Sequence, residues 1–190
     1  MTITAIKVYI DQGHNPFGFN TGAEGNGYFE QDITYEVGKI LYGYLSADPN
    51  FEARLSRPDE DTVLGTNNSG SLVARANMAN AWGADLFVSI HTNSAEDPSA
   101  NGSEALVYSE NSPAYELAED ILVRLNQETG LRNRGVVIRP GLYVLRKTNM
   151  PAVLVEIGFI SNPEEAQLMV EYPELFARGI YLGIQDYYGL

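Results

Sequence analysis

The sequence predicts a single α/β domain spanning residues 1–190, in which helices flank a mostly parallel, twisted sheet. Three observations lead to this fold class. Short apolar segments rich in β-branched residues alternate with longer segments whose apolar residues recur every three or four positions. No linker, internal repeat or low-complexity stretch divides the chain. A chain of 190 residues is also long enough to bury one sizeable core.

The elements of the first half follow from their patterns. The segment "AIKVYI" is apolar and β-branched, which is typical of a strand. Ile33, Val37 and Leu41 are spaced four residues apart and define one face of a helix. A stretch rich in Asp, Asn and Gly predicts a loop. In chain order we expect a strand Ala5–Ile10, a helix Gln31–Leu45, a strand Phe51–Arg57, a loop Pro58–Ser71 and a helix Leu72–Trp82 that ends at Gly83.

The second half carries clearer helix boundaries. Pro113 at the first position and Gly130 beyond the last predict the limits of a long amphipathic helix. Asn162, followed by Pro163 and then by Glu165 three residues on, has the pattern of a capping box. In chain order we expect strands Asp85–His91 and Ser103–Tyr108, a helix Ser112–Gly130, strands Leu142–Arg146 and Ala152–Phe159, a helix after Asn162 and a helix Pro173–Tyr188.

Composition excludes several classes of function. The formal net charge of −13 argues against binding to nucleic acid, and also against unaided adhesion to an anionic membrane. No apolar stretch approaches the length of a membrane helix, and the start "MTITAIKVYIDQG" lacks the pattern of a signal peptide. Because the chain has no cysteine, any transition metal must be held by histidine and carboxylate ligands.

The chain has only two histidines, and both follow apolar strand patterns. His14 comes after the first predicted strand, and His91 ends the strand "DLFVSIH". Separately, the first could be a turn residue and the second a core histidine. Together they indicate a site, because functional residues of open α/β sheets gather at the carboxyl ends of strands.

Two carboxylates complete the candidate site. Glu30 lies three residues before Ile33 and seven before Val37, so it shares the inward face of the first helix and is the candidate third metal ligand. Glu156 follows a run of apolar residues that predicts a strand buried on both faces. Burying a carboxylate costs free energy unless the group is paired, so its presence in such a strand indicates either a partner or a function. The functional interpretation of Glu156 is a general base beside a metal-activated water, and the structural alternative is a salt bridge with Arg146 or another cation.

The motifs carrying these residues resemble those of the zinc-dependent N-acetylmuramoyl-L-alanine amidases of bacteria and phages, the type 3 amidase family. The resemblance runs from about residue 7 to residue 188. It implies a six-stranded sheet, Zn²⁺ bound by His14, Glu30 and His91, and a catalytic role for Glu156. The matching segments are "IDQGHNP", the Glu30 segment, "SRPDED", "ARANMANAWGADLFVSIHTNSA" and "LYVLRKTNMPAVLVEIGFISNPEE".

The resemblance implies a substrate, a reaction and a place of action. The substrate is peptidoglycan, and the reaction is hydrolysis of the amide that joins N-acetylmuramic acid to L-alanine. The enzyme then acts on the cell wall, on the outer side of the cell. Two alternatives remain: a zinc peptidase that cuts a stem-peptide bond, and a non-catalytic wall-binding module that keeps the fold.

Several residues around the motifs have open roles. Family members commonly have Gly after the first histidine, so Asn15 and Pro16 are expected to reshape the rim of the site. Asn93 and Glu104 are candidates for contacting a ligand or substrate, or for an ordinary structural hydrogen bond, and Arg75 is expected to be structural. Some relatives carry an occluding helix after the second histidine. The ten residues Thr92–Asn101 are too few for one, which predicts an open site that needs no activating partner.

Overall fold

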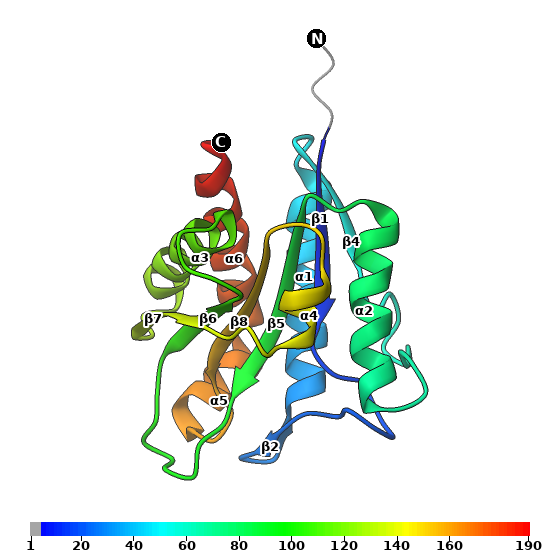
Figure 1. The fold of residues 1–190 in the computed structure, drawn as a ribbon. Helices are drawn as coiled ribbons and strands as arrows, with labels where there is room; N and C mark the ends of the chain where they lie inside the picture. The colour runs from blue at the N-terminus through cyan, green and yellow to red at the C-terminus, as the bar shows by residue number, and fades with distance from the viewer. Residues whose placement is uncertain (1–4) are drawn as a thin grey trace.

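The computed structural model describes residues 5–190, which form three layers with a sheet between two layers of helices (Figure 1). Residues 1–4, the start of the segment predicted to lack a signal peptide, lie outside the described residues. The strands are β1 (Ile6–Gln12), β2 (Glu24–Gly25), β3 (Tyr28–Phe29), β4 (Phe51–Leu55), β5 (Leu86–Asn93), β6 (Ser103–Val107), β7 (Asn133–Ile138) and β8 (Ala152–Phe159). The helices are α1 (Glu30–Ala47), α2 (Asn68–Trp82), α3 (Pro113–Thr129), α4 (Tyr143–Lys147), α5 (Pro163–Glu171) and α6 (Pro173–Tyr188).

The main sheet has six strands in the order β4-β1-β5-β8-β6-β7, which confirms the predicted α/β fold with a mostly parallel sheet. Every neighbouring pair is parallel except β6 and β8. Because β6 runs against β8, the beginning of β6 lies at the sheet edge where β1, β5 and β8 end. This edge therefore carries the ends of β4, β1, β5 and β8 and the beginnings of β6 and β7.

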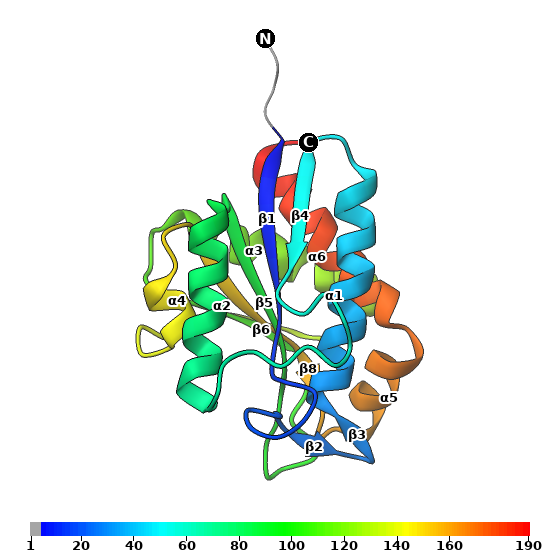
Figure 2. The ribbon, with the colours of Figure 1, turned by 90° about the vertical axis from the view of Figure 1, so that its right-hand side faces the viewer.

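Each face of the sheet packs on its own hydrophobic cluster. One face, with Val88 and Val153, packs against α1, α3 and α6 in the larger cluster. The other face, with Phe87 and Leu154, packs against α2 and α4 in a smaller cluster. Figure 2 shows α2 and α4 on one side of the sheet and α1, α6 and α5 on the other. Strands with apolar residues toward both layers explain the continuous apolar runs in the sequence.

The predicted helix boundaries depend on capping residues that the structure contains. The side chain of Asn67 accepts from the Gly70 N–H and begins α2, and Gly83 ends that helix in the left-handed conformation. Asn162 caps α5 as predicted. The second half of the predicted capping box is wrong. The Glu165 carboxylate accepts from the N–H groups of Gly102 and Phe159, and so ties the start of β6 to the end of β8.

Three local features differ from the sequence prediction. Residues 142–146 were expected to form a strand, but Tyr143–Lys147 form the short helix α4. Val144 and Leu145 are buried against the sheet, and five residues are too few for periodicity to separate a strand from one helical turn. The edge strand β7 and the small hairpin of β2 and β3 were not predicted, because both are short and partly polar.

Among residues 5–190, no helix is both long enough and apolar enough to cross a membrane.

Candidate metal centre and active site

The two histidines and Glu30 meet at the carboxyl end of the sheet, although they are far apart in the sequence. His91 lies near the end of β5, and His14 follows β1 in the left-handed backbone conformation, with φ of 70°. Glu30 is the first residue of α1 and is buried. These three residues are the cluster that could hold a metal ion, with their ligand atoms all within 4.8 Å of one another.

The ligand atoms converge on one oxygen of Glu30. His14 Nε2 lies 3.1 Å from Glu30 Oε1, and His91 Nδ1 lies 3.0 Å from the same oxygen. The two imidazole rings are nearly perpendicular, with their centroids 4.8 Å apart. Two nitrogens and one carboxylate with an open fourth position form a donor set that suits catalytic zinc.

The hydrogen bonds of His14 show that this cluster fits a cation. His14 Nδ1 lies 3.2 Å from Asn20 Oδ1, and the amide of Asn20 donates to Ser71 Oγ. Asn20 Oδ1 can only accept, so neutral His14 carries its proton on Nδ1 and presents a lone pair at Nε2. That lone pair faces a carboxylate oxygen, and two acceptors so close require a proton or a cation between them. Sequence reasoning did not identify Asn20.

Glu30 is held in its ionised form by its neighbours. Burial opposes ionisation, but protons that His14 and His91 carry toward the carboxylate when no metal is bound outweigh it, and the pKa of Glu30 lies well below its ordinary value. Backbone N–H groups fix both oxygens, since Ala23 donates to Oε2 at 2.8 Å and Thr92 donates to Oε1 at 3.0 Å. The carboxylate is therefore preorganised as a metal ligand.

Two glycines let the backbone pass close to the cluster. A Cβ on Gly13 would lie 2.5 Å from the Ile90 carbonyl oxygen and 2.6 Å from Cε1 of His91. A Cβ on Gly22, whose φ is 84°, would lie 2.8 Å from both Glu30 Oε2 and His14 Cδ2. Larger side chains at these positions would displace the candidate ligands.

Glu156 lies beside His91 and has no salt bridge. In the sheet, Glu156 pairs with His91 on β5 and with Glu104 on β6, so the three side chains share one face. Glu156 Oε2 is buried without a hydrogen-bond partner. Burial, followed by the negative charges of Glu30 and Glu104, raises the pKa of Glu156 to about 8. The alternative of a salt bridge with Arg146 is wrong, because the Arg146 guanidinium lies 5.9 Å from the centroid of the Tyr143 ring instead.

Asn93 and Glu104 interact with each other at the edge of the site. The Asn93 amide donates to Glu104 Oε1 at 3.0 Å, and Arg134 Nε donates to Glu104 Oε2 at 3.1 Å. Both carboxylate oxygens of Glu104 are thus engaged. These two bonds fix the Glu104 side chain next to Glu156, on the face of the sheet that they share with His91.

Arg75 supports the loop that carries His14, as its expected structural role suggests. Its guanidinium is fully buried and pairs with Asp11 at 2.6 Å. It also donates to the carbonyl oxygens of Gln12 and His14. These bonds hold the chain through the left-handed turn at His14, and they place a cation beneath the candidate ligands.

The expectation for Asn15 is wrong. Asn15 is completely buried, and its amide group exchanges hydrogen bonds with the backbone of Leu64. It therefore ties the segment after β1 to the loop before α2, and it does not reshape the rim. Comparison of motifs does not reveal this role, because the two hydrogen bonds join Asn15 to a residue far away in the sequence.

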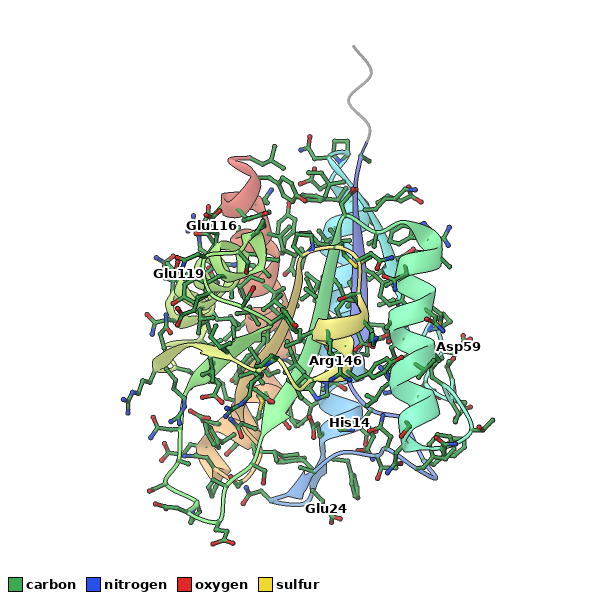
Figure 3. All side chains as sticks on the ribbon, viewed as in Figure 1. His14, Glu24, Asp59, Glu116, Glu119 and Arg146 are labelled. Atoms are coloured by element: carbon green, nitrogen blue, oxygen red, sulfur yellow. The ribbon has the colours of Figure 1, made fainter. Side chains whose placement is uncertain are left out.

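The helix α4 lies over the face that carries the candidate site. His14 and His91 share a cavity of about 120 Å³ with Leu142 and Tyr143. Figure 3 shows His14 at the end of the sheet, with Arg146 on α4 above it in that view.

Comparison with known proteins supplies the family. A profile of the N-acetylmuramoyl-L-alanine amidases matches residues 8–186. The chain belongs to this amidase family. The expected family is therefore confirmed over nearly the whole length of the chain.

Individual relatives agree with this assignment. The chain is 38% identical to the uncharacterised protein YqiI of Bacillus subtilis, over 95% of this chain and 84% of that protein. It is 35% identical to the N-acetylmuramoyl-L-alanine amidase LytC of the same organism, but it spans only 35% of the length of LytC. The crystal structure of an N-acetylmuramoyl-L-alanine amidase from Clostridium difficile 630 matches with a TM-score of 0.87 and 32% identity, over 97% of each chain.

Proposed function

We propose that this chain is a zinc-dependent amidase that hydrolyses the bond between N-acetylmuramic acid and L-alanine in peptidoglycan. One observation carries the proposal: His14, Glu30 and His91 converge on one point, next to an unpartnered buried carboxyl group on Glu156. Membership of the amidase family supports the choice of bond. The proposed place of action is the cell wall, where this substrate occurs.

The proposed ligands of Zn²⁺ are His14 Nε2, His91 Nδ1 and the carboxylate of Glu30. The Asn20 hydrogen bond keeps His14 in the tautomer that presents Nε2, as outer hydrogen bonds commonly do at metal sites. When bound, zinc lowers the pKa of a water molecule to about 7 and polarises a carbonyl group.

Glu156 is the proposed general base and general acid. Its carboxylate takes the proton from the attacking water and returns it to the nitrogen of the departing alanine. A carboxyl group whose pKa lies near the working pH can do both, and burial moves Glu156 in that direction. Glu104, on the next strand, adds negative charge beside it.

The proposal includes activity without an activating partner. The segment between β5 and β6 contains no helix. It is anchored to the β8–α5 turn, because the Ala95 N–H donates to Ser161 Oγ and Asn162 donates to the Ala100 carbonyl. These anchors keep the loop at the edge of the sheet.

Analysis of zinc content and digestion products tests the proposal. We expect purified protein to contain one zinc and to release free L-alanine amino termini from walls while leaving the glycan strands intact. Chelation should abolish the release, and added zinc should restore it. Full activity of a zinc-free sample would exclude the metal site. New amino termini within the stem peptide would indicate the zinc peptidase alternative, and no cleavage by zinc-loaded protein would indicate a wall-binding module.

A further inference from the structure

The cations of this acidic chain are concentrated in one segment beside the candidate site. The 27 residues from Thr129 to Val155 contain five of the 12 Lys and Arg residues and none of the 25 Asp and Glu residues. The five are Arg132, Arg134, Arg139, Arg146 and Lys147, and we call them the cationic segment. The rest of the molecule is strongly acidic, so this segment is a local reversal of sign.

Most of these cations have no structural partner. All five side chains are exposed. Among the ion pairs of residues 5–190, only Arg134 of this segment takes part. Exposed charged side chains contribute little to the stability of a fold, even where they form an ion pair. These cations are therefore available to contact a ligand.

Arg134 reaches the active-site edge from the β7 side. Its Nε donates to Glu104, its Nη1 donates to the Asn101 carbonyl at 3.1 Å, and its guanidinium lies 5.0 Å from the centroid of the Phe159 ring. Glu104 pairs in the sheet with Glu156. Arg134 is thus held rigidly next to the row of side chains that includes the proposed catalytic residue.

Arg146 and Lys147 lie on α4, the short helix whose first residues line the cavity of the site. They end α4, and Tyr143 at the start of that helix lines the cavity that contains His14 and His91. In Figure 3, Arg146 on α4 lies above His14, Glu24 lies below it, and Glu116 and Glu119 lie over α3. Arg146 is therefore the cation of the segment that approaches the proposed metal centre from the α4 side.

We propose that the cationic segment binds the carboxylates of the stem peptide, with Arg134 on one side of the scissile amide and Arg146 on the other. This inference rests on the proposed function. In that reaction the amide uses the amino group of alanine, so the far end of the departing peptide is a free carboxylate. A guanidinium group suits a carboxylate because it offers paired N–H donors in one plane. Arg146 offers such a pair, whereas Arg134 offers Nη2, since its Nε and Nη1 donate to Glu104 and to the Asn101 carbonyl. The segment also offsets the repulsion that an acidic protein exerts on an anionic substrate.

A pair of matched substrates tests the inference. One is an N-acetylmuramoyl-L-alanyl peptide that ends in a free carboxylate, and the other is the same peptide ending in a carboxamide. Zinc-loaded wild type is compared with Arg134→Gln, Arg134→Lys and Arg146→Gln. Arg178→Gln is the control, since it changes the net charge equally but lies on α6. Circular dichroism and the Tm verify folding of each variant.

We expect Arg134→Gln and Arg146→Gln each to lower kcat/KM on the carboxylate substrate about tenfold, mainly through KM. Arg146→Gln should change kcat/KM on the carboxamide substrate less than about twofold. Arg134→Gln also removes a bond that positions Glu104 beside Glu156, so we expect it to lower activity on both substrates, but several-fold more on the carboxylate, and Arg134→Lys should recover part of the loss. Equal losses on both substrates, or no loss on either, would overturn the inference. Weaker binding to walls that carry phosphate polymers, with unchanged kinetics on the soluble carboxylate, would assign the cations to those polymers and also overturn it.

A binding measurement separates this inference from the proposed function. The L-alanyl peptide product has no scissile amide, so its affinity can be measured by calorimetry in carboxylate and carboxamide forms. If wild type cleaves neither substrate but binds the carboxylate product more tightly, the proposed reaction is wrong and the cationic segment keeps its role. If wild type cleaves both substrates but binds the carboxylate and carboxamide products equally, the proposed reaction is right and the proposed role of the cationic segment is wrong.

Discussion

The two glutamates of the site have the same side chain but opposite environments. Glu30 has two backbone N–H groups and two histidines around its carboxylate, so it remains ionised. Glu156 has a buried oxygen with no donor, and its pKa is raised. Environments that separate two carboxylates in this way commonly separate their roles. The structure thus favours Glu30 as a ligand and Glu156 as the group that carries protons.

The Glu156→Gln variant tests this division. The amide keeps the size of the side chain but cannot accept or return the proton, so we expect activity to fall by about 10² to 10⁴. Folding and zinc content should not change, because Glu156 is not a proposed ligand. Muropeptide hydrolysis and metal analysis measure the two effects. Near-normal turnover would show that Glu156 is structural, whereas loss of zinc would make it a ligand in place of Glu30.

The buried pair of Arg75 and Asp11 supports the His14 turn and gives a prediction about pH. Burial works against ionised Asp11, but Arg75 and the Ser89 hydrogen bond outweigh it and hold its pKa below the ordinary value. Wild-type Asp11 is thus ionised in the folded protein down to acidic pH. Its stabilising contribution is present above the unfolded pKa and is lost as the pH falls through the folded pKa.

In Arg75→Met, only the Ser89 hydrogen bond would oppose the burial of Asp11, and the pKa of Asp11 should rise above the unfolded value because burial is the larger effect. The folded variant would then take up a proton more readily than the unfolded chain. The difference in unfolding free energy between wild type and the variant should therefore become smaller as the pH falls. We expect a loss of about 3–5 kcal/mol in unfolding free energy near pH 7, and a smaller loss at pH 5. Urea unfolding of zinc-free protein at both pH values measures this. An identical deficit at both would contradict the assigned role of Asp11.

At the scale of elements, the direction of β6 decides the composition of the site. Because β6 runs antiparallel to β8, its second residue Glu104 lies opposite Glu156 near the end of β8. A parallel β6 would bring its last residues to this edge instead. The loop before β6 is long enough to make the turn without adding a helix.

The loop between β5 and β6 gives a prediction about access to the site. Shortening residues 95–100 to a tight turn should not raise turnover on a small soluble muropeptide, because no helix covers the site from this loop. The wild-type chain serves as the reference, and Tm measurements verify that the shortened chain folds. A large gain in turnover would show that the loop is inhibitory and that the site is not open without a partner.

At the scale of the whole molecule, the proposed metal couples to folding. The ligands come from β5, from the start of α1 and from the segment after β1, so the unfolded chain does not hold them together. Zinc should therefore stabilise the folded state, by about 4 kcal/mol at a concentration 1,000 times its Kd.

We expect zinc to raise the Tm of wild type and of Glu156→Gln, and to leave the Tm of His91→Ala unchanged. Calorimetric or fluorescence melting at several zinc concentrations measures the shift independently of activity. A shift of wild-type size in His91→Ala would remove His91 from the ligand set.

The sequence by itself determined the fold class, the order of most elements and the residues of the candidate site. These are local properties, since apolar periodicity, caps and strand-ending histidines can be read along the chain. Residues 142–146 were misassigned because a five-residue segment has too few positions for its period to be measured. The two-residue strands β2 and β3 were missed for the same reason, and β7 was missed because its first half, residues 133–135, is polar and contains glycine.

Only the tertiary structure decided which partner each polar side chain has. The bonds of Asn20 with His14 and of Asn15 with Leu64 join residues that are separate in the sequence. The lack of a hydrogen-bond partner for Glu156 depends on which groups surround its side chain in the folded chain. The position of Arg134 beside Glu104 likewise depends on the pairing of β7 with β6. A hydrogen bond or an ion pair requires atoms within a few ångströms in a definite direction, and sequence pattern carries no such distance.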